Sequence, residues 1–326
     1  MIISRTPLRI SLGGGGTDAP SFYEHTPGFV LSAAIDKYIY IGVNATFTND
    51  YFLKYAEMER VDRIDEVQHR IIREALRLVD VSPGVEIVSL ADIPSGTGLG
   101  SSGSFTVGLL RALRAFRHQH TDTHDLAEDA CHIEIDLLGE PVGKQDQYIA
   151  AYGGITAFNF QPGGVVDVER LMISDDTRFA LEDHLLLFFT GYSRAASSIL
   201  ADQRDRSVEG DGRMLANLAE TMALGLEIKD ALEAGEPAEF GRLMHQHWEI
   251  KRRRTTGMSN PSIDRWYDLG MANGAIGGKL VGAGAGGFLM FYATDATRLR
   301  AAMTSEGLQE VRFLFAQDGS SVSVRG

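Results

Sequence analysis

The glycine- and serine-rich stretch Pro94–Ser104 has residue types and a spacing that suit the binding of a phosphate group. It follows an apolar, strand-like run at 85–90 and leads into a helix-like run. Glycines let backbone amides approach an anion without Cβ clashes, and a helix N-terminus adds unpaired N–H groups and a positive dipole end. Ser101, Ser102 or Ser104 can cap that helix, or one of them can bind a metal ion. We therefore expect a phosphate-binding loop here.

Two further glycine loops, Gly13–Asp18 and Gly282–Gly287, extend this pattern. Both Gly98–Gly103 and Gly282–Gly287 fit the dinucleotide pattern G-x-G-x-x-G. The last loop leads into a strand-like run instead of a helix, and the middle loop lacks the acidic residue that should end a second strand. A Walker A loop also fails, because Leu280 stands where a serine or threonine should follow Lys279. The three loops therefore need another interpretation.

The segments around these loops predict an α+β fold in two parts. Residues 1–60 are rich in strand-forming residues, and the polar run Ser174–Arg178 predicts a boundary between domains 1–178 and 179–326. In the first part we expect strands at 2–12, 29–35, 38–45, 85–90, 153–160 and 165–173, and helices at 65–79, 105–116 and 122–138, with a short helix ending near residue 152. In the second part we expect strands at 185–190, 275–281, 288–292 and 309–316, and helices at 195–206, 211–233, 237–254, 262–273 and 295–305.

Composition narrows the class of protein. With 326 residues, 44% of them hydrophobic, the chain can bury a large core, more naturally in two domains than in one. The net charge of −13 disfavours a nucleic-acid partner, which would need basic patches. Cys131 has no second cysteine to pair with, which suits a reducing compartment. No apolar run reaches the roughly 20 residues that span a bilayer, and the N-terminus lacks a signal-peptide layout. We expect a cytoplasmic protein without a membrane partner and leave a homodimer open.

Taken together, the three loops resemble, in order and spacing, the three motifs of the GHMP small-molecule kinases. The matching stretches are 7–18, 94–103 and 279–287. The resemblance covers nearly the whole chain and implies a two-domain α+β fold, with an N-terminal half like a ribosomal-protein β-α fold and a ferredoxin-like C-terminal half. ATP would lie between the halves. Its phosphates would lie on the middle loop, at Pro94, Gly96, Gly98, Leu99, Gly100, Ser101, Ser102 and Gly103.

The resemblance also implies roles for charged residues. Asp146 matches the family's acid that accepts the proton of the substrate hydroxyl or orients that group, and Arg9 would lie beside it and the transferred phosphoryl group. Glu134 would bind Mg²⁺ together with Ser102, or with Ser101 as second choice. Simpler interpretations stay open: Asp146 as a helix cap, Glu134 as part of a charged helix face, and Arg9 as a surface charge at a strand edge.

The form of the first loop resembles that of D-glycero-D-manno-heptose 7-phosphate kinases, which phosphorylate an anomeric hydroxyl group to give a 1,7-bisphosphate. The stretches 190–198 and 258–264 match as well. The resemblance implies substrate contacts at Gly14, Gly15, Gly16, Thr17, Asp18, Arg194, Lys279 and Gly284. Asp18 could instead be a turn or cap residue.

The phosphate of such a substrate would need an anion site of its own. We favour Arg194 because neighbouring serines could form a helix N-terminus beside it. Lys37 and the run Lys251–Arg254 are further candidates, although such a run is more typical of a solvated helix end.

Three other functions remain open. Fucokinase-like sugar kinases share the glycine-rich first loop. A non-catalytic sensor of sugar and nucleotide could use the same fold, but Asp146 and Glu134 are both present, which argues against it. An ATP-dependent decarboxylase of the same superfamily would need a site for a substrate carboxylate, and the sugar-type first loop argues against that.

Overall fold

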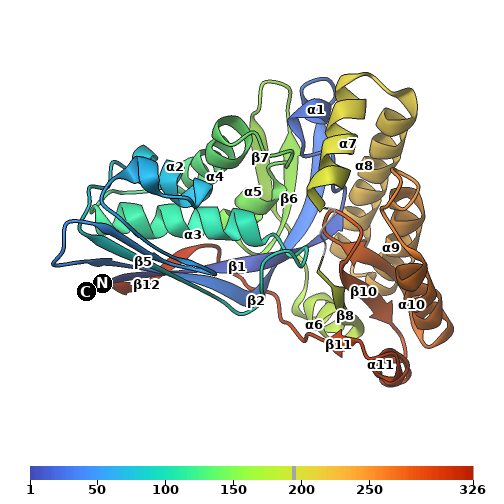
Figure 1. Ribbon diagram of the computed structural model, residues 1–326. Coiled ribbons are helices and arrows are strands. Elements are labelled where there is room, and N and C mark those ends of the chain that lie inside the picture. Colours follow the sequence, from blue (N-terminus) through green and yellow to red (C-terminus); the bar gives the residue numbers. More distant parts are fainter. Residues whose placement is uncertain (193–195, 326) are drawn as a thin grey trace.

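The computed structural model describes residues 1–192 and 196–325. Within these residues, twelve strands form one sheet of eight strands and one of four. Figure 1 shows helix α3 lying along the larger sheet, and helices α7, α8, α9 and α10 gathered at the other end of the molecule. Among the described helices, none combines the length and the apolar character that crossing a membrane requires.

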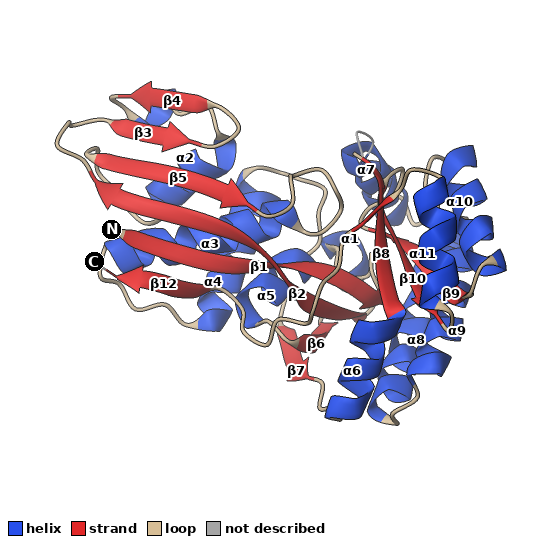
Figure 2. Ribbon diagram, turned by 90° about the horizontal axis from the view of Figure 1, so that it is seen from below, coloured by secondary structure: helices blue, strands red, loops and turns tan. Residues whose placement is uncertain are grey.

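The larger sheet has the strand order β12-β1-β2-β5-β3-β4, and β6 joins β2 to β7. Its strands are β1 (Ile2–Gly13), β2 (Gly28–Ala45), β3 (Tyr51–Lys54), β4 (Met58–Val61), β5 (Val85–Ala91), β6 (Ile155–Phe160), β7 (Val166–Arg170) and β12 (Ser321–Arg325). Figure 2 shows β5, β2, β1 and β12 side by side as the broad part of this sheet. All pairs are antiparallel except β3 with β5, which is parallel.

One face of this sheet is covered by helices because their apolar residues face it. In α3, side chains such as Leu109, Leu110 and Leu113 are completely buried. The elements on this side and in the connections are α1 (Pro20–Tyr23), η1 (Ile64–Glu66), α2 (Arg70–Leu78), α3 (Ser101–Phe116), α4 (Thr123–Cys131), η2 (His132–Leu137) and α5 (Gln145–Tyr152). Helix α5 begins beside the first glycine loop, and its first turn contacts Gly103 in the first turn of α3, so the two helix N-termini lie beside each other.

The smaller sheet has the order β11-β8-β10-β9. Its strands are β8 (Leu185–Gly191), β9 (Ala275–Val281), β10 (Gly287–Ala293) and β11 (Gln309–Glu310). The helices of this part are α6 (Asp175–His184), α7 (Ala196–Val208), α8 (Gly212–Glu233), α9 (Pro237–Lys251), α10 (Pro261–Ala272) and α11 (Ala296–Ser305). The third glycine loop is the turn between β9 and β10, so it leads from strand to strand as its sequence predicted.

Two local expectations were wrong, and a third segment has a defined local structure. The strands expected at 29–35 and 38–45 are one strand, β2, whose first half pairs with β6 and whose second half pairs with β5. The polar run Ser174–Arg178 forms the start of α6, where Ser174 caps the helix and accepts a hydrogen bond from the Thr177 amide at 3.1 Å. The long strand expected at 309–316 is only Gln309–Glu310.

The two sheets are connected more closely than a simple division of the chain suggests. The C-terminal strand β12 returns to the larger sheet and pairs with β1. Leu224 and Ile228 of α8 and Phe288 of β10 belong to the same hydrophobic core as β1 and β2. The division at residue 178 stays a prediction, and a cut there would expose apolar surface on both parts.

Candidate active site

The middle and third glycine loops lie against each other. A Cβ atom added to Gly98 would lie 2.8 Å from the carbonyl oxygen of Val281, and one added to Gly282 would lie 2.7 Å from the Cα of Gly98. Gly98 also has a φ of +85°, which L-residues rarely adopt. Glycine is therefore needed here both for its backbone angle and for the close approach. The two loops therefore border the same region of the structure.

Arg9, on β1, connects the middle loop to Asp146 at the start of α5. Its Nε and Nη2 donate to the two carboxylate oxygens of Asp146 at 2.7 and 2.8 Å, and its Nη1 donates to the Gly98 carbonyl at 2.6 Å. The Arg9 side chain is 8% exposed and that of Asp146 is 28% exposed. Arg9 is therefore no surface charge at a strand edge. A bidentate pair fixes the direction of the carboxylate, and the exposed part of Asp146 leaves lone pairs for a substrate hydroxyl.

The close contact of α3 and α5 places this carboxylate beside the loop. A Cβ atom added to Gly103, in the first turn of α3, would lie 2.7 Å from the Cβ of Asp146 and 3.0 Å from the Gln147 amide nitrogen. Any larger residue at position 103 would push the two helix N-termini apart. The glycine thus brings the middle glycine loop and Asp146 into one site.

Ser102 and Glu134 form a second polar pair beside the loop. The Ser102 hydroxyl donates to Glu134 Oε2 at 2.6 Å, and Gln147 Nε2 donates to Oε1 at 3.0 Å. Glu134 lies in the π-helical segment η2 and is 1% exposed, so it is not part of a solvated helix face. Burial raises the pKa of Glu134, and the hydrogen bonds from Ser102 and Gln147 only partly oppose this.

These residues fit a magnesium ion. In the described part of the chain, no lysine or arginine pairs with Glu134, so its buried negative charge has no cationic partner. The hydroxyl of Ser101 is buried there without a hydrogen-bond partner. A carboxylate and a hydroxyl beside a phosphate loop are the oxygen donors that Mg²⁺ uses together with substrate phosphates.

The first glycine loop is held by its own threonine and aspartate. Thr17 Oγ1 donates to the carbonyls of Gly14 and Phe29 at 2.9 and 2.8 Å. Asp18 accepts from the amide of Gly16 at 3.0 Å and from that of Gln145 at 3.1 Å. Asp18 therefore caps the N-terminus of α5, because it binds the amide of Gln145, the residue that precedes Asp146. Burial raises the pKa of Asp18, and the nearby charge of Asp146 adds to the rise.

Residues of the C-terminal part reach this loop. Lys279 Nζ donates to the carbonyl of Leu12 at 3.0 Å, and burial lowers the pKa of Lys279 to about 7. Arg254 Nη1 donates to the carbonyl of Gly15 at 3.1 Å, and Gln203 Nε2 donates to that of Gly16 at 3.1 Å. The first loop is thus fixed from both parts of the chain.

The charged run Lys251–Arg254, a further candidate for the anion site, is only partly the solvated helix end that such runs usually form. Lys251 and Arg254 are 8% and 4% exposed. Lys251 Nζ donates to the carbonyl of Gly282 at 2.5 Å and so holds the third loop. A separation of three residues puts Lys251 and Arg254 on the same side of a helical turn, and this spacing was the signal that could have revealed them. Gln203 carried no such signal.

The other predicted substrate residues are less closely gathered. Arg194 lies outside the described residues. Gly284 packs on the connection between α9 and α10, where an added Cβ atom would lie 2.7 Å from Met258 Sδ. Lys37, on β2, pairs with its neighbour Asp36 at 2.8 Å.

The geometry above agrees with the comparison to protein families. The pattern of the GHMP kinase N-terminal domain matches residues 66–154, and that of the GHMP kinase C-terminal domain matches residues 228–309. The chain belongs to the GHMP kinase family. The resemblance of its three loops and the expected two-domain α+β fold are confirmed.

Relatives of this GHMP kinase are sugar kinases. It is 29% identical to a D-glycero-alpha-D-manno-heptose 7-phosphate kinase of Campylobacter jejuni, over 98% of this chain and 97% of that one. It is 28% identical to an L-fucokinase/L-fucose-1-P guanylyltransferase of Bacteroides fragilis, over 93% of this chain but 36% of that one. The protein is therefore a sugar kinase that uses ATP.

A solved structure has the same fold over its full length. The crystal structure of a D-glycero-D-manno-heptose 1-phosphate kinase from Bacteroides thetaiotaomicron covers 100% of both chains with a TM-score of 0.81 at 24% identity.

Proposed function

We propose that this kinase transfers the γ-phosphoryl group of ATP to the anomeric hydroxyl group of D-glycero-D-manno-heptose 7-phosphate, giving the 1,7-bisphosphate. The observation that carries the proposal is the convergence of the sugar-type loop Gly13–Asp18 with Asp146 and the phosphate loop. The heptose specificity is supported by the end-to-end similarity to the Campylobacter heptose 7-phosphate kinase.

In this proposal Asp146 accepts the proton of the sugar hydroxyl or orients that hydroxyl for attack. Arg9 stabilises the negative charge of the moving phosphoryl group, since its guanidinium lies between Asp146 and Gly98. Asp18 and the amides around Gly16 bind the sugar hydroxyls. Because Asp18 and Asp146 lie at the same helix N-terminus, the reacting hydroxyl would be held close to the carboxylate.

Ser102 and Glu134 would hold Mg²⁺. The ion would neutralise phosphate charge, as magnesium does in phosphoryl transfer generally. The protein orients the carboxylate of Glu134 for this role. Gln147 donates to one of its oxygens, and the other oxygen accepts from the hydroxyl of Ser102. Ser101 remains the second choice for the hydroxyl ligand of the ion. In its favour, the Oγ of Ser101 is buried without a partner among the described residues.

Replacing Glu134 by glutamine is expected to weaken Mg²⁺ binding about tenfold or more, because the neutral amide loses the charge attraction to the ion. Titrating the activity with Mg²⁺ at saturating ATP measures this change. Direct binding of Mn²⁺ as a spectroscopic probe gives a readout that does not depend on turnover. The exposed Glu239→Gln, which loses the same charge on the surface of α9, is the matched control. Equal metal dependence in both variants would remove Glu134 from the metal site.

The same substitution has a predicted effect on stability in the absence of metal. When the pKa of an acid is higher in the folded state than in the unfolded state, the acid destabilises the fold at pH values above its unfolded-state pKa. This cost disappears as the pH falls below the unfolded-state pKa. Glu134→Gln should therefore raise the thermal midpoint of the metal-free protein at neutral pH, and the gain should vanish below the ordinary glutamate pKa of 4.5. Thermal unfolding between pH 4 and pH 7.5 measures it. A lower midpoint at neutral pH would contradict the assigned environment.

The proposed activity can be tested with a panel of acceptors: heptose 7-phosphate, the unphosphorylated heptose, fucose, galactose and mevalonate. Release of ADP is measured for each acceptor. We expect the highest kcat/KM with heptose 7-phosphate. A preference for fucose would favour the fucokinase-like alternative, and turnover only with unphosphorylated sugars would overturn the heptose phosphate proposal.

A further inference from the structure

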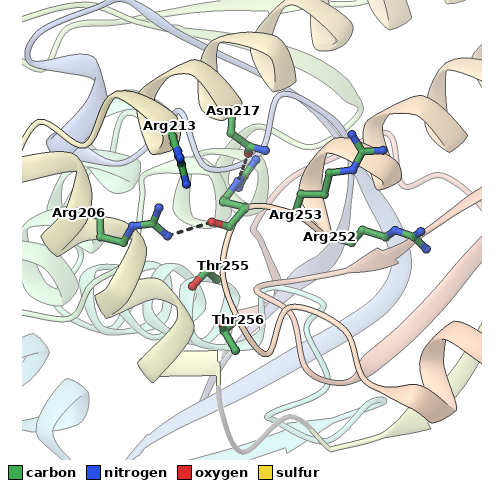
Figure 3. A pocket seen from close by; sticks show the side chains of 8 residues that line it. Arg206, Arg213, Asn217, Arg252, Arg253, Thr255 and Thr256 are labelled. Atoms are coloured by element: carbon green, nitrogen blue, oxygen red, sulfur yellow. Dashed lines mark hydrogen bonds between the residues drawn. The ribbon is translucent and has the colours of Figure 1, made fainter.

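An arginine-lined pocket lies next to the first glycine loop, Gly13–Asp18, on the side of the C-terminal helices, and we refer to this loop below as the sugar loop. The cavity has a volume of about 430 Å³. It lies between the end of α7, the start of α8 and the connection from α9 to α10, as Figure 3 shows. This volume is within the range of small-molecule sites and is larger than a lone phosphate ion requires. We refer to it as the arginine pocket, lined by Arg206, Arg213, Asn217, Arg252–Arg254, Thr255 and Thr256.

The lining carries five arginines and no carboxylate, in a protein whose net charge is −13. Two of the arginines share the acid Glu249, at 3.3 Å from Arg252 and 3.5 Å from Arg253. The guanidinium of Arg213 has no carboxylate partner among the described residues. In Figure 3, Arg213 points from α8 toward the backbone that leads to Thr255, while Arg252 and Arg253 extend to the far side of that backbone.

Arg206 reaches the same backbone from α7. It pairs with Asp211 at 2.7 Å and donates through Nη1 to the Arg254 carbonyl at 3.1 Å. Asp202 lies 3.6 Å from Arg206. These acids hold Arg206 in place from outside the lining. The guanidinium of Arg206 is therefore positioned before any ligand binds, and a preorganised cationic donor favours an anion.

Arg254 connects the pocket to the sugar loop. Its side chain is buried and donates to Asn217 Oδ1, Gln203 Oε1 and Thr221 Oγ1 at 2.9, 3.1 and 2.8 Å. Its Nη1 also donates to the Gly15 carbonyl at 3.1 Å. All of these acceptors are neutral, so among the described residues the guanidinium has no counter-ion in hydrogen-bond contact, although the charge of Asp18 stabilises it from a distance. Burial lowers the pKa of Arg254 to about 10. An anion in the neighbouring cavity would reduce the cost of this buried positive charge.

We propose that the arginine pocket binds the phosphate group of a small phosphorylated molecule and that Arg254 couples this binding to the sugar loop. Two sources have this chemistry. One is the acceptor sugar's own phosphate, which rests on the proposed function. The other is a separate phosphorylated metabolite that regulates the kinase. In both cases the anion lies next to the residue that holds the Gly15 carbonyl.

The test uses inorganic phosphate as the probe and keeps the ATP loop occupied. The full-length protein is saturated with Mg²⁺ and a non-hydrolysable ATP analogue, so that phosphate cannot bind at the middle loop. The pocket variant is Arg206→Gln with Arg213→Gln, which removes the two guanidinium groups that reach the cavity from α7 and α8. The control is Arg63→Gln with Arg242→Gln, which removes the same charge from exposed side chains that are 72% and 62% accessible. Phosphate binding is followed as the rise of the thermal midpoint at constant ionic strength.

We expect the wild type and the control to bind phosphate with similar Kd, and the pocket variant to bind it at least about tenfold more weakly. Equal phosphate binding by the pocket variant and the control would overturn the proposal. This result does not depend on which sugar is phosphorylated, so its failure is distinct from a failure of the proposed function.

Steady-state kinetics then separates the two sources. If the pocket holds the acceptor's phosphate, the pocket variant raises KM for the phosphorylated sugar, leaves KM for the unphosphorylated sugar unchanged, and phosphate competes with the phosphorylated acceptor. If the ligand is a separate metabolite, phosphate still stabilises the protein when the acceptor is saturating, and KM is unchanged without phosphate. Both results support an anion site in the pocket.

Discussion

Replacing Asp146 by asparagine is expected to lower kcat by about 10²–10⁴-fold, the range in which a positioned acid or base acts. Asparagine has nearly the same shape, but it cannot accept a proton and offers Arg9 one oxygen instead of two. The bidentate pair of 2.7 and 2.8 Å would therefore be lost together with the proton acceptor. KM for ATP should change little, because the phosphate loop contacts Arg9 through the separate bond to Gly98.

The matched control is Asp65→Asn, because Asp65 is also paired with an arginine, Arg77, at 2.5 Å but is exposed on the surface. It should retain full activity. Steady-state kinetics at saturating ATP and acceptor measures both variants, and circular dichroism shows that both are folded. If Asp146→Asn keeps the kcat of the control, Asp146 is neither a base nor a positioning group.

Replacing Gly98 by alanine is expected to raise KM for ATP about tenfold or more and to destabilise the fold. The added methyl group would meet the Val281 carbonyl at 2.8 Å, and neither loop can move without disturbing the other. Overpacking of this kind costs about 1–3 kcal/mol, in addition to about 1–2 kcal/mol for alanine at a positive φ. Isothermal titration with a non-hydrolysable ATP analogue and denaturant unfolding measure the two effects.

Gly163→Ala separates these two costs. Gly163 has a φ of +83°, close to that of Gly98, but an added Cβ atom there would meet no atom within 4 Å. Its variant should show only the cost of the backbone angle and should bind the ATP analogue as the wild type does. Similar ATP binding by the two alanine variants would mean that the contact between the loops at Gly98 and Val281 does not shape the nucleotide site.

The parts of the site that could be predicted from the sequence are those that local chemistry determines. The middle glycine loop leads from a strand to a helix, which is typical of a phosphate-binding loop, and three glycine loops in a fixed order indicated the kinase family. The sequence also pointed to Arg9 and Asp146, although it could not show that both carboxylate oxygens of Asp146 bind Arg9. That contact joins residues 137 positions apart in the sequence.

Tertiary packing determined the features that the sequence did not reveal. Lys251 and Arg254 have charges typical of a solvated helix end, yet both are buried because backbone carbonyls of the glycine loops supply their acceptors. Such acceptors lie far away in the sequence and leave no local pattern. The return of β12 to β1 is similar, because nothing in the last residues specifies which strand they will pair with.

The most direct test of the proposed activity is the position of the phosphate in the product. The kinase is incubated with Mg²⁺, ATP and D-glycero-D-manno-heptose 7-phosphate, and the product is examined by phosphorus NMR with coupling to protons. We expect a second phosphorus signal coupled to the anomeric proton, beside the retained signal of the 7-phosphate. A new phosphate coupled to any other ring proton, or no new sugar phosphate under conditions in which another sugar is phosphorylated, would contradict the proposed function.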